Sequence, residues 1–377
     1  MNLEPTEEQL SLRATVRRFL QEKASVADHV RPLLDDPTGM TDAGWLALAE
    51  LGTTGLLVPA DHGGAGMTMV EAGVVLDELG AGLHPGPWLS SAVAATRALT
   101  RVPTAGETGK LLAGIADGST IATVGPLEPA APRPAATATA DGDAVTLRGE
   151  IAQIADAAAA DVLLVLASDD DGTGLYAVDT SSPYVAVTPR RSIDQTRKVF
   201  RVTLHDAPAR RLGPAPAEAI QALVDDVLVA SAADALGAAR ALLDLTVAHA
   251  KVRRQFGQPV GAFQAVAHLC VDMYETVELA RGGVLHALWA ADAATPAQRH
   301  RAALRAKAFA GRLATVGDTA IQVFGGLGYT WEHDSHLYLK RLLSWSALLG
   351  GPDSYLREVG SQLVHELNPQ GADHEHQ

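Results

Sequence analysis

The spacing of apolar residues along the chain changes twice, and the first part has the period of helices. Thr6 and Gln9 fit a capping box, and apolar positions from Leu12 to Leu20 then recur at helical spacing. Glycine and proline separate this segment from further helical patterns. These patterns predict an α-helical N-terminal domain over residues 1–118, with helices at residues 44–51, 70–79 and 88–99.

The middle of the chain has the short β-rich runs typical of strands. Turn-forming residues at 141–143 and 169–173 separate these runs. We therefore expect a small antiparallel β domain over residues 119–213. The Pro/Ala-rich segment Pro126–Thr139 has low complexity, and we interpret it as a loop or linker. The predicted strands are residues 144–147, 162–166, 175–178 and 199–204.

Long Ala/Leu-rich periodic segments with few helix breakers make up the last part. They predict a C-terminal bundle of long antiparallel helices over residues 214–377. The order helical, β, helical predicts an α+β fold that is mainly α. The predicted long helices are residues 217–251, 263–291, 295–324 and 335–349.

Composition narrows the kinds of partner and site. The formal net charge of −14 argues against nucleic acid or an anionic membrane as a partner, because both need clustered lysine and arginine. Cys270 is the only cysteine, so an internal disulfide is excluded. The first residues have neither a basic region nor an apolar run, and no apolar stretch approaches the roughly 20 residues of a membrane span. We expect a cytoplasmic protein.

Two motifs in the last part suit a dinucleotide pyrophosphate. Arg253 opens the motif Arg-Arg-Gln-Phe-Gly at residues 253–257 and offers a cation with several donors. Gln264 follows eleven residues after Arg253 and adds an amide. The second motif, Gln-Val-Phe-Gly-Gly-Leu-Gly at residues 322–328, contains adjacent glycines that let a phosphate approach the backbone closely.

With Val58–Gly66 and Asp194–Arg197, these motifs resemble the acyl-CoA dehydrogenase family over nearly the whole chain. Residues 328–341 look like the actinobacterial heteromeric branch that acts on steroid side chains. The resemblance implies an acyl-CoA thioester substrate, an FAD cofactor and an electron-transfer flavoprotein as electron acceptor. It also implies residues that hold the FAD of a neighbouring subunit: Arg253, Gln255, Phe256, Gln264, Gln322, Val323, Phe324, Gly325 and Gly326.

The catalytic base of that family is missing. The family's Tyr-Glu-Gly-Thr glutamate, which removes the α-proton, corresponds to Gly350, and its alternative position on an earlier helix corresponds to Val227. Neither residue can accept a proton. Asp234 lies seven residues after Val227, on the same helix face, and is the best candidate within the chain. It is one methylene shorter than glutamate and lies about 10 Å further along the axis. Asp225 and Asp226 are expected to be solvated near the helix start.

The flavin-ring contacts of the family are also poorly represented. Its Thr-Glu-Pro-x-x-Gly-Ser-Asp loop corresponds to residues 125–132, where Glu128-Pro129 is all that matches. Its Trp-Ile-Thr strand corresponds to Ile151–Gln153, which has no aromatic residue. Arg190 and Arg191 are interpreted as contacts to a CoA phosphate or as solvated loop charges. The spacing within Glu332–His336 is too tight for a metal site on a helix, and no metal is expected.

Three hypotheses follow. In the first, the chain is the glutamate-lacking subunit of an α2β2 acyl-CoA dehydrogenase, and a related subunit provides the base. In the second, it is a catalytically inactive homo-oligomeric binding or scaffold protein. In the third, it is a self-sufficient dehydrogenase that uses Asp234.

Overall fold

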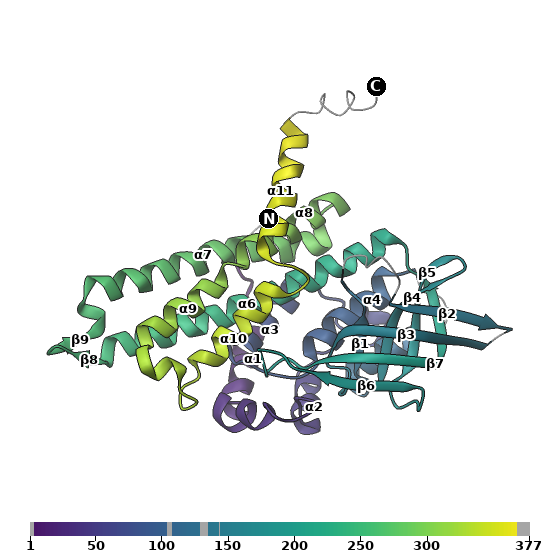
Figure 1. Cartoon of the computed structure of the whole chain (residues 1–377), viewed down its shortest axis with the longest axis horizontal. Helices are drawn as coiled ribbons and strands as arrows, with labels where there is room; N and C mark the ends of the chain where they lie inside the picture. Colours follow the sequence, from purple (N-terminus) through teal and green to yellow (C-terminus); the bar gives the residue numbers. More distant parts are fainter. Residues whose placement is uncertain (1–3, 104–107, 129–134, 143, 368–377) are drawn as a thin grey trace.

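Helices form the first part of the chain, as the apolar spacing predicts. The computed structural model describes residues 4–103, 108–128, 135–142 and 144–367 (Figure 1). The side chain of Thr6 accepts a hydrogen bond from the backbone N–H of Gln9, and the Gln9 side chain accepts one from Thr6, so the predicted capping box is confirmed. The helices are α1 (Glu7–Lys23), α2 (Asp42–Glu50), α3 (Met69–Ala81), α4 (Thr96–Arg101) and α5 (Thr108–Asp117), with the π-helices η1 (Val26–Val30) and η4 (Leu89–Ala95) and the 3-10 turns η2 (Arg31–Leu33) and η3 (Ala60–His62).

The middle part folds into one seven-stranded sheet with the order β1-β4-β2-β3-β7-β5, in which β6 pairs with β7 and β4 also pairs with β5. Most pairings are antiparallel, but β1 and β2 each run parallel to β4, so the sheet is mixed rather than purely antiparallel. Part of the Pro/Ala-rich segment is strand β2, which corrects its interpretation as a loop. The strands are β1 (Ala122–Gly125), β2 (Ala136–Asp141), β3 (Ala144–Ala155), β4 (Val162–Asp169), β5 (Gly172–Asp179), β6 (Val185–Arg190) and β7 (Val199–Pro214).

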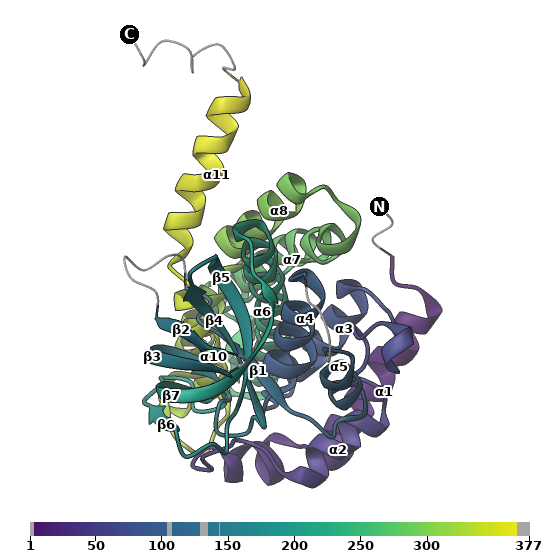
Figure 2. The ribbon, with the colours of Figure 1, turned by 90° about the vertical axis from the view of Figure 1, so that its right-hand side faces the viewer.

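The last part is a bundle of long helices. The single helix predicted over residues 295–324 is divided at Gly311, where an added Cβ would lie 2.3 Å from Cγ of Pro352. A final helix, which the sequence pattern did not indicate, projects from the body of the molecule (Figure 2). The elements are α6 (Ala217–Val252), β8 (Arg254–Gln255), β9 (Gln258–Pro259), η5 (Val260–Ala262), α7 (Gln264–Ala293), α8 (Pro296–Ala310), α9 (Leu313–Phe324), η6 (Gly325–Tyr329), α10 (Ser335–Ala347) and α11 (Pro352–Leu367).

Helices α3 and α6 cross in backbone contact. A Cβ on Gly80 would lie 1.9 Å from the carbonyl oxygen of Asp234, and a Cβ on Gly237 would lie 1.8 Å from the carbonyl oxygen of Asp77. Real Cβ atoms do not approach so closely, so each helix uses a glycine where the other crosses it. The crossing joins the first and last parts of the chain directly.

The buried apolar residues form separate clusters that follow this architecture. The largest cluster contains residues of α1 and α3 together with residues of α6 to α10, so the two helical parts share a core. The sheet encloses its own cluster, which includes Ile151, Ile154 and Tyr176. A third cluster lies where α4, α5 and α6 meet the sheet, and contains Val227. Within the described residues, no helix is long and apolar enough to cross a membrane.

Candidate functional site

The Arg-Arg-Gln-Phe-Gly motif forms a turn at one end of the bundle. Arg253 directly follows α6, and Arg254 and Gln255 pair with Gln258 and Pro259 in the short hairpin β8-β9. Phe256 at the turn has a φ of 51° and is 91% exposed. A bulky apolar side chain held in solvent at a turn is available for contact with another molecule.

The second motif lies at the same end. The Phe324 ring packs against His249, one turn before Arg253, with ring centroids 4.7 Å apart, and against His333 at 4.3 Å. Phe324 is therefore buried, while Gln322, Gly325 and Gly326 are exposed. Gly325 ends α9 with a φ of 62°, a conformation in which glycine is favoured. We call the predicted FAD contacts at this end, Arg253, Gln255, Phe256, Gln264 and Gln322–Gly326, the tip cluster.

The tip cluster and the sheet lie in opposite halves of the molecule. In Figure 1 the hairpin β8-β9 is at the left end of the long axis, and the strands β2 to β7 occupy the right half. A flavin against strand β3 of this chain is therefore far from the chain's own tip cluster.

Strand β3 offers little to a flavin ring. Ile151 is buried in the sheet core, and Ala152 and Gln153 are exposed. Arg190 donates from Nη1 to the carbonyl oxygen of Ala152 at 2.9 Å. Glu128 is exposed, and Pro129 lies outside the described residues. The described part of this face has neither an aromatic wall nor a cluster of hydroxyl donors.

The two family positions for the base lie in different surroundings. Val227 is buried where α6 meets α4 and the sheet. Gly350 is exposed in the loop between α10 and α11, with a φ of 112°, and Leu349 before it has a φ of 54°. Because L-residues rarely adopt the conformation of Gly350, a glutamate there would need a different loop.

Asp234 lies among arginines. Its Oδ1 accepts from Nε of Arg341 at 2.8 Å and its Oδ2 from Nη2 of Arg341 at 2.9 Å, while Arg197 donates to Oδ2 at 2.5 Å. Burial opposes ionisation, but the charges and hydrogen bonds of the two arginines outweigh it and lower the pKa of the Asp234 carboxyl. A base for an α-proton needs a raised pKa and a free oxygen, so this geometry favours a structural role.

The same cluster links all three parts of the chain. Arg341 on α10 also donates from Nη1 to Oγ1 of Thr196, at the end of the sheet domain, and from Nη2 to the carbonyl oxygen of His84, after α3. No local pattern could have revealed these contacts, because Thr196 and Arg341 are 145 residues apart.

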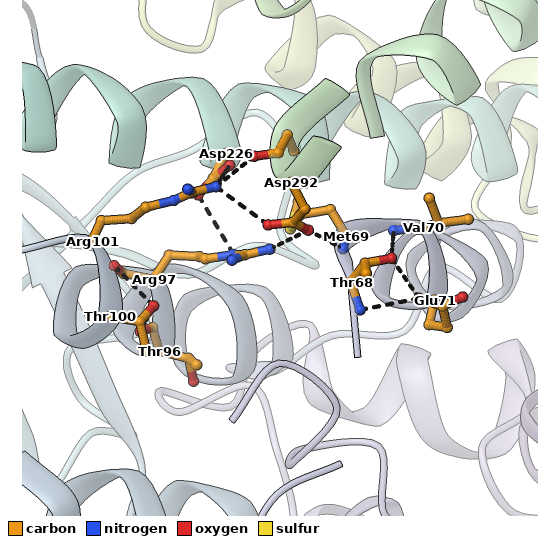
Figure 3. Close-up of polar contacts among 11 residues, drawn as sticks. Thr68, Met69, Val70, Glu71, Thr96, Arg97, Thr100, Arg101, Asp226 and Asp292 are labelled. Atoms are coloured by element: carbon orange, nitrogen blue, oxygen red, sulfur yellow. Dashed lines mark hydrogen bonds and ion pairs between the residues drawn. The ribbon is translucent and has the colours of Figure 1, made fainter. Parts of the chain in front are cut away.

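Asp225 and Asp226 are buried rather than solvated, which corrects the expectation from their place near the helix start. Asp226 accepts from Nε of Arg101 at 2.9 Å, and Arg97 lies 3.5 Å from the same oxygen (Figure 3). Asp292 at the end of α7 completes this cluster, accepting from Arg97 at 2.7 Å. Asp225 contacts Nδ1 of His300 at 2.8 Å, which raises the pKa of that histidine.

The acidic and histidine segment before α10 also has structural partners. Asp334 accepts from Nε and Nη2 of Arg31 at 2.9 and 2.7 Å, and Nδ1 of His333 lies 3.0 Å from Oγ of Ser335. In the part of the chain that the structure describes, no group of three or more His, Cys, Asp or Glu side chains is arranged to hold a metal ion.

A helical–β–helical chain with this arrangement has the architecture of flavin-dependent thioester oxidoreductases. Residues 6–119 match the description "Acyl-CoA dehydrogenase, N-terminal domain", and residues 221–363 match "Acyl-CoA dehydrogenase, C-terminal domain". The chain belongs to the acyl-CoA dehydrogenase family, and family membership implies FAD as its cofactor.

Curated relatives come from mycobacteria. The chain is 33% identical over 360 residues to the acyl-CoA dehydrogenase IpdE2 of Mycolicibacterium smegmatis, covering 95% of this chain and 99% of that protein. It is 35% identical over 364 residues to the acyl-CoA dehydrogenase FadE34 of Mycobacterium tuberculosis, covering 94% of this chain but 48% of that protein. The chain thus spans about half the length of FadE34.

Solved structures include related pairs of proteins. The Tcur3481-Tcur3483 steroid ACAD has a TM-score of 0.86 and 31% identity, with coverage of 96% of this chain and 99% of that chain. The ChsE4-ChsE5 complex from Mycobacterium tuberculosis has a TM-score of 0.86 and 27% identity, with coverage of 97% and 99%.

Proposed function

We propose that the chain is one subunit of a heteromeric, FAD-dependent acyl-CoA dehydrogenase, and that a related subunit supplies the catalytic base. The observation that carries this proposal is the contrast between the two halves of the site. The tip cluster has the exposed donors and the glycine turn that a flavin pyrophosphate needs, whereas Gly350 and Val227 occupy the base positions and Asp234 is ion-paired.

The relatives support a division between subunits. Two of the similar structures are named for pairs of proteins, Tcur3481-Tcur3483 and ChsE4-ChsE5. FadE34 has, beyond the 48% that the chain covers, room for a second unit of this size in one polypeptide. The steroid ACAD also suggests the substrate class, a bulky CoA thioester such as a steroid side chain.

In the proposed assembly, this chain's residues hold the cofactor of the partner. The Arg253 guanidinium would neutralise the pyrophosphate, Gln264 and Gln322 would donate amide hydrogen bonds, and Gly325 would admit the phosphate to the backbone. FAD bound there supplies the two-electron acceptor for α,β-desaturation of the thioester. The partner's carboxylate would take the α-proton, and an electron-transfer flavoprotein would reoxidise the flavin.

The experiment is to purify the chain alone and together with the product of a neighbouring gene that encodes a relative with the flavin loop and the glutamate. Flavin absorbance and acyl-CoA desaturation are expected only in the mixture. Arg253→Gln in this chain should reduce the FAD retained by the mixture about tenfold, from the loss of one charged hydrogen bond. Arg18→Gln, an exposed arginine on α1, is the matched control and should leave FAD retention unchanged.

Other outcomes would support the remaining hypotheses. A colourless and inactive protein in both preparations would favour the homo-oligomeric scaffold. Desaturation by the chain alone, abolished by Asp234→Asn without loss of stability, would favour the self-sufficient dehydrogenase. The ion pairs of Asp234 argue against that last outcome.

A further inference from the structure

A polar groove lies where the three parts of the chain meet, apart from the tip cluster. Its walls are the segment Leu34–Pro37 after η2, the end of β6 with the following loop and the start of β7, and Lys340 on α10. The groove has a volume of about 600 Å³, and neither the tip cluster nor the base positions line it. Ligand sites for small molecules have volumes of roughly 300–1,000 Å³, so the groove has room for a ligand the size of a nucleotide.

The charge of the groove is opposite to that of the whole chain. Five cationic side chains line it, against three carboxylates. The chain as a whole has 30 lysines and arginines against 44 aspartates and glutamates. A local excess of positive charge on an acidic protein attracts anions to this place. The five cations are Arg190, Arg191, Arg197, Lys198 and Lys340, and the carboxylates are Asp35, Asp36 and Asp194.

Internal contacts already satisfy some of these charges. Arg197 is paired with Asp234. Asp36 accepts from the backbone N–H groups of Thr38 and Gly39 and from the Thr38 hydroxyl, which lowers the pKa of its carboxyl, and Asp194 accepts through Oδ1 from Thr196. These groups shape the walls of the groove.

Four cations keep donors for a ligand. Arg190 uses Nη1 for the carbonyl oxygen of Ala152, and Lys198 donates from Nζ to the carbonyl oxygen of Leu34 at 2.6 Å. Lys340 lies with its Nζ 4.6 Å from the centre of the Trp331 ring. Arg191 is exposed and has no hydrogen-bond partner among the residues that the structure describes. Each of these side chains has N–H groups left over.

We propose that this groove binds a phosphorylated small molecule of nucleotide size, with Arg190, Arg191, Lys198 and Lys340 as its phosphate contacts. Planar guanidinium groups match phosphate oxygens with paired hydrogen bonds, and lysines add point charges. Burial lowers the pKa of Lys198, and a bound dianion would hold its ammonium charged. The Arg190 contact to Ala152 also connects an occupant of the groove to strand β3, which faces the flavin in the family.

The test is isothermal titration of the purified full chain with ADP, inorganic pyrophosphate and adenosine. ADP and pyrophosphate should bind with a Kd below about 1 mM, and adenosine should not bind. Equal affinity for ADP and pyrophosphate would assign binding to the phosphates alone, and a tighter affinity for ADP would assign a nucleotide. Raising the salt from 50 to 200 mM should weaken both, because the contacts are charged.

Variants separate the groove from the tip cluster, which is proposed to contact the ADP half of FAD. Arg191→Gln with Lys340→Gln should weaken ADP binding at least about tenfold and leave FAD retention in the two-subunit mixture unchanged. Arg253→Gln should have the opposite pattern. Absence of binding at 5 mM pyrophosphate, or wild-type affinity in the doubly substituted chain with an unchanged unfolding midpoint, would overturn the proposal without affecting the proposed function.

Discussion

The role of Asp234 can be tested by replacing it with asparagine. The wild-type carboxylate neutralises Arg341, which is 2% exposed, and accepts the bonds from Arg197. Asn keeps the shape but removes the charge and turns an N–H group toward a guanidinium. Removal of one partner from a buried ion pair costs about 3–5 kcal/mol. We therefore expect a loss of about 4 kcal/mol in the free energy of unfolding.

That loss can be converted into a temperature. The entropy of unfolding is about 2.1 cal/mol/K per residue, so for 377 residues a loss of about 4 kcal/mol lowers the unfolding midpoint by about 5 °C. Scanning calorimetry at neutral pH measures it. Asp244→Asn, an exposed aspartate on the same helix α6, is the control and should change the midpoint by less than about 1 °C.

The pH dependence of this difference follows from the lowered pKa of Asp234. A carboxyl whose pKa is lower in the folded state stabilises the protein above its unfolded pKa of about 3.8 and loses this contribution as the pH falls through the folded value. The gap between wild type and Asp234→Asn should stay constant from pH 8 to pH 5 and shrink below about pH 4. An unchanged midpoint together with abolished desaturation would refute the structural role and identify Asp234 as the base.

Three further predictions concern other parts of the chain. Burial lowers the pKa of Lys307 to about 7, so unfolded chains bind more protons between about pH 7 and 10.5, and wild-type stability should rise across that window relative to Lys307→Met, as measured by unfolding midpoints at pH 7 and 9. Gly80→Ala should destabilise the protein by about 1–3 kcal/mol through its clash with the Asp234 backbone, whereas Gly360→Ala, on α11 with open space around it, should stabilise it by up to about 1 kcal/mol in urea titrations. Gly350→Glu should give no desaturation by the isolated chain, since the φ of 112° does not suit a side chain there, and an active Gly350→Glu chain in a CoA-thioester assay would contradict this explanation.

Local patterns in the sequence were enough for the order of the elements but not for their ends or partners. The Thr6 capping box is a short-range signal and was correctly predicted. The break at Gly311 depends on Pro352, and strand β2 forms because Ala136–Asp141 pairs with β3 across a turn. Both depend on contacts that apolar spacing does not encode.

The candidate site illustrates the same limit with charges. Two adjacent aspartates near the start of a helix look solvated, yet the partners of Asp226 are Arg97 and Arg101, 129 and 125 residues earlier in the chain. Single arginines on helices carry no sign of such pairing in the sequence. Motifs that act through exposed groups, such as residues 253–257, can be recognised because their residue types are required by the ligand and not by the surrounding protein.

The shared core of the helical parts has an evolutionary consequence. Two separate family descriptions match residues 6–119 and 221–363, yet these segments enclose one apolar cluster and cross in backbone contact at Gly80 and Gly237. Recombination that exchanged either segment alone would split that core. The sheet, with its own apolar cluster, is the part of this lineage where substitutions accumulate with the least penalty elsewhere. Divergence between paralogous copies is therefore expected to begin in the strands, while the helices are inherited as one unit.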